Sequence, residues 1–307
     1  MYKPGMVSKI LVKNMKKFKN PIGVNNWELN SWWRVLNVKK SGRRLLFTGM
    51  MYQLAPYIAA ITDKLYSFEN TFFESLISTV SFVPSLTKVF FKPIEADLQR
   101  FNRILLNIYS ILLKSVEFCY NPKIDFYSGI LLYDLGLDDI FERHARNVVE
   151  TLEKNGVKEI ITIDPHTTYA LKELYPEYVG VEYEVFNYLE IARAGFKDEG
   201  CVTLHDPCYY ARYLDIYDQP REILSSAGFE CMDVRNSKKM TYCCGAPIES
   251  LSPKLAKEIA KIRFSELKET GCKIVTLCPL CLVSLKSFGN VYDIAEVLGE
   301  FNDKATC

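Results

Sequence analysis

Several signals that would place this 307-residue chain in a common class are absent from it. It has no clean run of about 20 apolar residues, so the sequence predicts no membrane-spanning helix. Its N-terminus lacks the short apolar stretch and cleavage site of a secretory signal, which favours a cytoplasmic chain. It also has no glycine-rich phosphate-binding motif, so a flavin or nicotinamide would have to be carried by a partner subunit.

Net charge is small, +1, but it is unevenly distributed. Residues 1–44 hold eleven basic residues and one acid, Glu28, while the other 263 residues hold 27 basic and 36 acidic residues. We interpret 1–44 as a basic N-terminal segment that is either solvated or docks on an acidic partner or an anionic membrane. Membrane docking would place the chain peripherally on the inner membrane face. Because no nucleic-acid recognition motif accompanies the charge, we expect no nucleic-acid partner.

Cysteine, by contrast, is present in an unusual arrangement. Five of the ten cysteines form the pattern C-x34-C-C-G-x32-C-P-L-C, namely Cys208, Cys243, Cys244, Cys278 and Cys281. Thiolates grouped in this way hold zinc or iron–sulfur clusters. Two adjacent side chains rarely ligate one small tetrahedral ion, and a four-thiolate zinc site would leave the fifth cysteine without a role. The pattern therefore favours an iron–sulfur cluster and electron transfer.

The remaining five cysteines match no position of this pattern. We expect most of them to be small core side chains, with a structural place for Cys272 and an exposed one for Cys307. The five are Cys119, Cys201, Cys231, Cys272 and Cys307.

The second half of the chain alternates predicted strands and helices. The apolar run 202–204 precedes Cys208, and residues 253–270 predict an amphipathic helix that Gly271 stops. Its apolar positions are Leu255, Ile259, Ile262, Phe264 and Leu267. A strand at 273–277 runs directly into Cys278, which places this cysteine where α/β sheets hold their sites.

An internal repeat indicates the organisation of the whole chain. Residues 153–172 align with 268–286, and the segments around Met50 and Tyr127 align with those around Cys208 and Cys243. We therefore predict an α/β fold of two pseudo-repeated lobes, each a small mostly parallel sheet with flanking helices. The first copy has lost all five thiolates. Their positions are taken by Met50, Tyr127, Ser128, Asp164 and Thr167.

The repeat also divides the chain into segments. We predict a basic N-terminal segment at 1–44, a degenerate lobe at 45–195 and a complete lobe at 196–307. The first lobe carries roughly 40 extra residues, within about 55–118, that are rich in apolar and aromatic side chains. This insert is either two or three core-packing helices or an amphipathic element that docks on a partner or a membrane surface.

Several residues beside the cysteines are candidates for supporting roles. His205 is either a hydrogen-bond donor to a cluster sulfur or a satisfied histidine at a strand end. Gly245 would let the backbone approach the cluster and donate N–H groups, and Arg212 would stabilise negative charge or simply lie on the surface. His166 and Asp164 are expected at the vacated first site, where a residual zinc site is conceivable.

The complete pattern resembles the cysteine-rich CCG domain found in the B-type subunit of heterodisulfide reductase. The supporting phrases are His205-Asp206-Pro207-Cys208-Tyr209 and Cys243-Cys244-Gly245-Ala246-Pro247. The same domain occurs in iron–sulfur subunits of glycolate, lactate and glycerol-3-phosphate oxidation systems and in some succinate dehydrogenase and fumarate reductase assemblies. The resemblance covers most of 45–299 as two copies. It implies that the five cysteines hold a noncubane [4Fe-4S] cluster, one per chain, because the first motif is empty.

The resemblance implies an iron–sulfur redox subunit that is active only within a multi-subunit oxidoreductase. Its partners would be other iron–sulfur or flavin-carrying subunits, and its substrate a disulfide or thiol, or a quinone. Disulfide chemistry requires a substrate-sized cavity beside Cys243 and Cys244. The first alternative is an electron-relay or membrane-docking subunit of a glycolate, lactate, glycerol-3-phosphate or succinate dehydrogenase-type complex, with a buried cluster. The second is a non-enzymatic scaffold.

Overall fold

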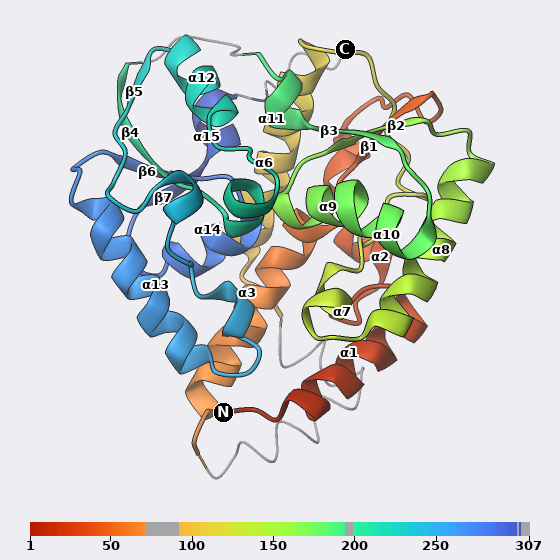
Figure 1. Cartoon of the computed structure of the whole chain (residues 1–307), viewed down its shortest axis with the longest axis horizontal. Helices are drawn as coiled ribbons and strands as arrows, with labels where there is room; N and C mark the ends of the chain where they lie inside the picture. Colours follow the sequence, from red (N-terminus) through yellow and green to blue (C-terminus); the bar gives the residue numbers. More distant parts are fainter. Residues whose placement is uncertain (72–91, 194–198, 300, 302–307) are drawn as a thin grey trace.

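Two parallel sheets organise the protein (Figure 1). The computed structural model describes residues 1–71, 92–193, 199–299 and 301. The first sheet has the order β1-β2-β3 and the second the order β5-β4-β6-β7, and all neighbouring strands are parallel. The strands are β1 (Arg44–Phe47), β2 (Glu159–Thr162), β3 (Glu184–Asn187), β4 (Gly200–His205), β5 (Phe229–Cys231), β6 (Lys273–Thr276) and β7 (Val291–Asp293). The predicted fold class is confirmed.

Helices flank both sheets. The first lobe comprises β1–β3 with α7 (Ile130–Asp134), α8 (Asp138–Lys154), α9 (Pro165–Tyr169), α10 (Tyr175–Val179) and α11 (Tyr188–Ile191). The second lobe comprises β4–β7 with α12 (Gln219–Ser226), α13 (Pro253–Lys268), α14 (Pro279–Leu285) and α15 (Ile294–Leu298). Short 3-10 turns are η1 (Trp32–Val35), η4 (Lys238–Met240) and η5 (Ala246–Ile248), and single π-turns are η2 (Ala170–Leu174) and η3 (Tyr209–Tyr213).

The predicted pseudo-repeat is visible in the order and capping of these elements. β1, β2 and β3 correspond to β4, β6 and β7, and the second sheet adds β5 at its edge. The helices after β3 and β7 both begin with a capping box, in which the N-cap side chain and a glutamate three residues later exchange hydrogen bonds with the backbone. These pairs are Asn187 with Glu190 and Asp293 with Glu296. The same capping box thus recurs at equivalent positions of the two lobes.

The two lobes meet through a reciprocal pair of buried hydrogen bonds. Tyr52 donates from its hydroxyl to Oδ2 of Asp293 at 2.8 Å, and Nδ2 of Asn187 donates to the hydroxyl of Tyr210. In the repeat, Tyr52 is equivalent to Tyr210 and Asn187 to Asp293. The tyrosine of each copy is therefore hydrogen-bonded to the N-cap residue of the other copy, as expected for two units related by an approximate two-fold axis.

Two long helices of the insert lie between the lobes in Figure 1, α3 (Met51–Phe68) and α6 (Glu95–Leu113). They pack against each other, and α14 and α15 pack on them, so the prediction of core-packing helices is confirmed for these two. The rest of the insert, 72–91, lies outside the described residues. Among the helices of the described residues, none combines the length and hydrophobicity needed to cross a bilayer.

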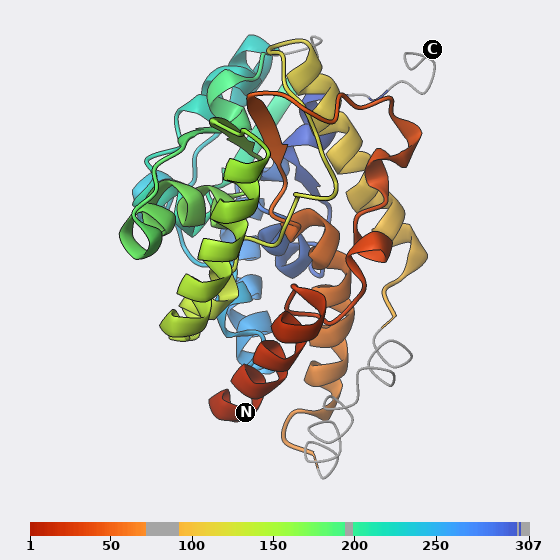
Figure 2. The same cartoon turned by 90° about the vertical axis from the view of Figure 1, so that its right-hand side faces the viewer.

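The N-terminal segment is folded onto this body rather than extended into solvent. Helix α1 (Pro4–Phe18) passes below the lobes, with its start beside the end of α3, as Figures 1 and 2 show. The hydroxyl of Tyr2 donates to the carbonyl of Leu65 at 2.8 Å. Leu11 and Met15 are buried, whereas the lysines of α1 are exposed. A short helix α2 (Asn26–Leu29) follows.

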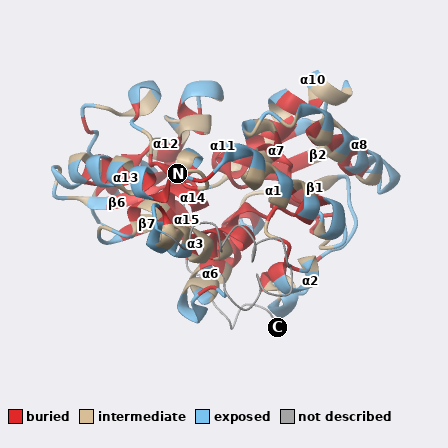
Figure 3. Ribbon diagram, turned by 90° about the horizontal axis from the view of Figure 1, so that it is seen from below, coloured by how far each residue is buried: buried red, intermediate tan, exposed pale blue. Residues whose placement is uncertain are grey.

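Helix α13 buries only part of the apolar stripe that the sequence predicts: Phe264 and Leu267 are buried as expected, and Ile259 is half-buried. Its buried residues include Ala256, Ala260 and Phe264, whereas Leu255 and Ile262 are 47% and 64% exposed. At Ala256 the packing is tight, because the backbone of Gly245 approaches α13 so closely that a Cβ on Gly245 would lie 2.3 Å from the carbonyl oxygen of Ala256. In Figure 3 the buried residues gather inside the lobes, and the outer faces of α8 and α13 are exposed.

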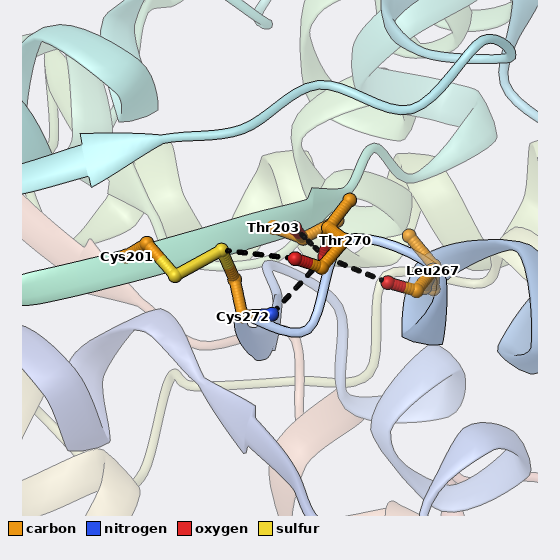
Figure 4. The surroundings of a disulfide bond; sticks show 5 residues. All are labelled: Cys201, Thr203, Leu267, Thr270 and Cys272. Carbon is orange, nitrogen blue, oxygen red and sulfur yellow. Dashed lines mark hydrogen bonds between the residues drawn. A yellow bond between two sulfur atoms is a disulfide. The ribbon is translucent and has the colours of Figure 1, made fainter.

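Cys201, which was expected to be a core side chain, is instead joined to Cys272, which was expected to have a structural place. Cys201 at the start of β4 and Cys272 just before β6 form a disulfide, shown in Figure 4. Beside it, Thr203 and Thr270 share a hydrogen bond of 2.6 Å between their hydroxyls. The pairing escaped prediction because sequence spacing alone does not give disulfide connectivity. Cys119 is buried as expected, Cys231 is half-buried, and Cys307 lies outside the described residues.

Candidate functional site

The five pattern cysteines come together at the carboxyl ends of β4 and β6. Cys208 follows β4, Cys278 is the N-cap of α14 directly after β6, and Cys281 lies in the first turn of α14. The pair Cys243 and Cys244 comes from the loop that enters η5. Cys281 donates from its thiol to Sγ of Cys244 at 3.1 Å, and all five side chains line one cavity. The structure thus brings the five predicted side chains together where the strands end.

The thiols of this group differ in how readily they ionise. Hydrogen bonds from Cys243 and Cys281 hold the pKa of Cys244 well below its usual value. Burial raises the pKa of Cys278, but a hydrogen bond from Cys281 and the nearby imidazole of His166 outweigh it and bring it to about 6. Burial raises the pKa of Cys208 to about 11. Cys244 and Cys278, whose pKa values are lowered, are therefore the thiols that ionise most readily. This suits metal binding, since the thiolate is the form that binds a metal.

Gly245 shapes the turn that presents the adjacent pair. Its φ of 90° lies in the left-handed region that favours glycine. Its backbone N–H donates to Sγ of Cys243 at 3.3 Å. Together with the close approach to α13, this turn leaves no room for a side chain, so glycine is required here for both conformation and packing.

His205 lies at the end of β4, buried against the cysteines. One of its ring nitrogens is within 4.8 Å of Sγ of Cys244 and of Sγ of Cys281. Nε of Arg263 donates to Nδ1 of His205 at 3.1 Å. Because arginine can only donate, Nδ1 is the acceptor and the neutral ring carries its proton on Nε2. Nε2 is buried and has no partner among the described residues.

His166 reaches the same site from the first lobe. It was expected at the vacated first site, where its Nδ1 does lie 3.6 Å from Oδ1 of Asp164, and the same nitrogen lies 3.9 Å from Sγ of Cys278 in the second lobe. This second contact arises because α9 of the first lobe packs on η3 of the second lobe. At the same boundary, the ring of His166 contacts the ring of Tyr209 edge-on, with 5.2 Å between the ring centroids. Burial lowers the pKa of His166, but Cys278 and Asp164 outweigh it and hold the pKa above its usual value.

The two arginines near Cys208 have different surroundings. Arg212 lines the cavity and donates to the carbonyl of Thr241. Arg221 instead pairs with Asp206 at 2.8 Å and Asp233 at 2.6 Å. Arg221 is therefore committed to structural ion pairs, whereas Arg212 remains a candidate for stabilising charge in the cavity.

The equivalent site of the first lobe is closed. Met50, Tyr127, Ser128, Asp164 and Thr167 are all at most 1% exposed. Oδ1 of Asp164 caps α9 by accepting from the N–H groups of His166 and Thr167, each at 3.0 Å. Ser128 Oγ, Asp164 Oδ2 and Thr167 Oγ1 have no partners among the described residues. With no thiolate in the set, this site does not fit an iron–sulfur cluster.

The cavity beside the cysteines has a volume of about 730 Å³. The cysteines and His166 line it together with apolar side chains of α1, α3 and α6. Sequence reasoning missed this contribution of the N-terminal segment and the insert, although the apolar face of α1 was a signal. It also missed Glu249, a buried carboxyl in the cavity wall whose pKa burial raises to about 8.

Comparison with known proteins gives the chemical context of this site. Residues 202–286 match the family described as a cysteine-rich domain, CCG. The chain is 29% identical over 231 residues to an EtfAB:quinone oxidoreductase of Syntrophomonas wolfei, covering 65% of this chain and 32% of that protein. It is 28% identical over 186 residues to the D-type subunit of a dihydromethanophenazine:CoB–CoM heterodisulfide reductase of Methanosarcina barkeri, covering 53% of this chain and 46% of that protein.

A probable membrane-anchored ferredoxin of Chromohalobacter salexigens is 32% identical over 197 residues, covering 56% of this chain and 29% of that protein. The chain thus spans less than half the length of these relatives. It carries a CCG cysteine-rich domain at 202–286, and its homologues are D-type subunits of heterodisulfide reductase and related iron–sulfur oxidoreductases. The match supports iron–sulfur cluster binding by this chain.

Proposed function

We propose that this chain, with its CCG domain at 202–286, is an iron–sulfur redox subunit that binds one noncubane [4Fe-4S] cluster. Cys208, Cys243, Cys244, Cys278 and Cys281 hold the cluster. The chain works with other iron–sulfur or flavin-carrying subunits in a multi-subunit oxidoreductase. It resembles the B-type subunit of heterodisulfide reductase in its complete motif and differs in having a single one.

The observation that carries this proposal is the convergence of five thiols, including an adjacent pair, in the wall of one cavity. Four thiolates suffice for a mononuclear zinc site, so a fifth converging thiol favours an extended cluster. The cluster would supply one-electron transfer. The first lobe has no comparable donor set among its described residues, which supports a count of one.

Residues around the cysteines would adjust the properties of the cluster. Nδ1 of His205 accepts from Arg263, and a ring nitrogen of His205 lies within 4.8 Å of Sγ of Cys244 and of Cys281, so His205 would act as a hydrogen-bond donor to cluster sulfur through Nε2 rather than as a ligand. The N–H of Gly245 donates to Cys243, and Arg212 adds positive charge at the cavity wall. Donors and positive charge favour the reduced form and raise the reduction potential.

The cavity supports a role in exchanging electrons with a small molecule, either a disulfide or thiol substrate or a quinone. A pure relay needs no open volume beside its cluster, and a scaffold needs no convergent thiols. The cavity therefore favours the redox enzyme role over the electron-relay and scaffold alternatives. The basic N-terminal segment remains a candidate for contact with a partner or a membrane surface.

Anaerobic purification followed by iron and sulfide quantitation and paramagnetic resonance tests the proposal. We expect about four irons and four sulfides per chain and a cluster signal. Cys244→Ser should lose most of the iron, while Cys231→Ser, which changes a half-buried free cysteine outside the group, should keep it. A wild-type chain without iron, or a Cys244→Ser chain with its full iron content, would refute the assignment.

A further inference from the structure

Arg263 in α13 is fully buried, which is rare for an arginine. Its Nε donates to Nδ1 of His205 at 3.1 Å, and its Nη2 donates to Oγ1 of Thr241 at 3.3 Å. Its Nη1 donates to the carbonyl of Asn236 at 2.8 Å and to the carboxylate of Glu266 at 2.5 Å. Burying a guanidinium is costly unless its charge and its N–H groups are paired, and this one is held by four partners.

The internal repeat indicates whether the fold itself needs this buried arginine. When the two copies are aligned, Val148 takes the position of Arg263 and Phe47 takes that of His205. The first two residues lie in the equivalent helices α8 and α13, and the other two end the equivalent strands β1 and β4. Val148 and Phe47 are both buried. The first lobe therefore folds with an apolar pair in the place of the arginine and the histidine.

A neighbouring contact, in contrast, is present in both lobes. The hydroxyl of Thr241 donates to the carbonyl of Asp206 at 2.9 Å, which links the end of β4 to the loop that carries Cys243. At the equivalent positions of the first lobe, the hydroxyl of Thr48 donates to Oδ2 of Asp125 at 2.7 Å. The link from strand to loop thus forms with and without thiols, whereas the apolar pair of the first lobe cannot make the arginine–histidine contact. That contact therefore belongs to the cysteine site rather than to the fold.

The contact with Arg263 also decides which ring nitrogen of His205 can donate. A guanidinium donates hydrogen bonds and never accepts them, so Nδ1 is the acceptor and the neutral ring carries its proton on Nε2. Nε2 is buried without a partner among the described residues, and a ring nitrogen of His205 lies within 4.8 Å of Sγ of Cys244 and of Cys281. A buried donor without an acceptor is unfavourable, and sulfur of a bound cluster would supply that acceptor.

We propose that Arg263 is a positioning residue for the cluster, which holds His205 with its Nε2 proton toward cluster sulfur and thereby raises the reduction potential. This inference rests on the proposed function and names a residue that adjusts the same site without binding the cluster. Hydrogen bonds to the sulfurs of a cluster are among the factors that set its potential. Because Glu266 balances the charge of Arg263, the arginine acts through its hydrogen bond to His205 rather than through its own charge.

Redox titration of the iron-loaded full chain, followed by paramagnetic resonance, tests this inference in a double-mutant cycle. His205→Phe should favour the oxidised form about tenfold, a shift of about 60 mV to lower potential for a one-electron couple. Arg263→Met, which removes the donor to Nδ1, should give a similar shift in the wild-type chain. In the His205→Phe background it should change the ratio of the two forms by less than about twofold. A shift of the same size in both backgrounds would mean that the arginine acts through its charge, and would overturn the inference.

A spectroscopic measurement and a matched variant separate this role from a purely structural one. Electron–nuclear double resonance should detect an exchangeable proton coupled to the cluster that is lost in His205→Phe and in Arg263→Met. Arg235→Met, which removes an exposed arginine, is the matched control and should keep both this proton and the wild-type potential. Retention of the full set of exchangeable protons in His205→Phe would contradict the inference.

Iron content decides how each outcome is interpreted. If Arg263→Met alone loses its iron, the comparison of His205→Phe with the double variant replaces it, since neither has the donor and their potentials should be equal. Potentials about tenfold apart in the ratio of the two forms would overturn the inference. An iron-loaded wild-type chain whose potential His205→Phe leaves unchanged also overturns it, and the cluster assignment stands. A wild-type chain without iron overturns the proposed function itself.

Discussion

The two lobes share a topology but differ in what occupies the ends of their central strands. In the second lobe, Cys243 and its neighbours line an open cavity. In the first, the equivalent Tyr127 is fully buried, and Gly49 lies so close to Thr167 that a Cβ would be 1.9 Å from its hydroxyl. The first copy of the repeat therefore keeps its strands and its capping box although it lacks the thiol ligands, because larger side chains fill the space at its strand ends.

The lobe without thiolates nevertheless remains part of the site. It supplies His166 beside Cys278. It also supplies Asn187 and Tyr52 to the reciprocal hydrogen bonds that hold the lobes together. The lobe without thiolates therefore supports the cysteine site of the other lobe.

The largest expected effect comes from removing the side chain that fills the first site. Tyr127→Ala should destabilise the apo protein by ~3–5 kcal/mol, because it removes a fully buried aromatic ring and leaves a cavity. The equivalent change, Cys243→Ala, should cost the apo protein less than ~1 kcal/mol, because Cys243 is half-buried and faces open volume, yet it should abolish cluster binding. Urea unfolding and iron content measure the two effects.

An equal loss of stability in both variants would contradict this contrast. It would mean that the second site is also filled by packing when no cluster is bound. Tyr127→Phe is the control, since it keeps the ring and removes only the hydroxyl, which accepts a hydrogen bond from the N–H of Leu131. It should cost ~1 kcal/mol.

The reciprocal hydrogen bonds should be of unequal strength although they occupy equivalent positions. Tyr52→Phe should destabilise by ~1–3 kcal/mol, because it leaves the buried Oδ2 of Asp293 without its donor. Tyr210→Phe should cost about 1 kcal/mol, because Nδ2 of Asn187 keeps a second acceptor, the hydroxyl of Thr168 at 3.0 Å. Denaturant unfolding of both variants tests the order, and a larger loss for Tyr210→Phe would reverse it.

The smallest effect is expected at the oxygens of the closed first site. Thr167→Val replaces a buried hydroxyl that has no partner among the described residues with a methyl group of similar size. It should change the free energy of unfolding by less than ~0.5 kcal/mol, or stabilise the protein slightly. A loss above ~1 kcal/mol would show that this hydroxyl holds a bound water or ion. The matched Cys281→Val should remove the cluster.

Much of the fold and of the cysteine site follows from the sequence. The repeat predicts two parallel sheets because a buried apolar run followed by Cys278 or by Asp164 marks the same strand end twice. The adjacent pair Cys243 and Cys244 identifies the cluster type to test. Gly245 was predicted to shape the turn after the pair and donate its N–H to sulfur, and the structure adds a second reason for glycine, the close packing on α13.

The parts that escaped prediction depend on how segments distant in the sequence pack. A repeat alignment assigns His166 to its own lobe, but the contact with Cys278 arises from the docking of two lobes. The cavity depends on side chains of α1 and α3 that the repeat does not contain. Leu255 and Ile262 were expected to be buried because periodicity marks an apolar stripe, but only Phe264 and Leu267 of that stripe are buried, and Gly245 packs closely on Ala256 beside them.

The disulfide between Cys201 and Cys272 has a consequence for assembly. It joins residues 71 apart in the sequence, and the covalent ring it closes contains Cys208, Cys243 and Cys244. In the chain-entropy account, a ring of this size removes ~4 kcal/mol of freedom from the unfolded polypeptide. Three of the five thiols are thereby confined together, with Cys278 and Cys281 just beyond the closure. Formation of this disulfide would therefore raise the local concentration of the sulfur donors and favour iron binding, as linking ligands does in a chelate.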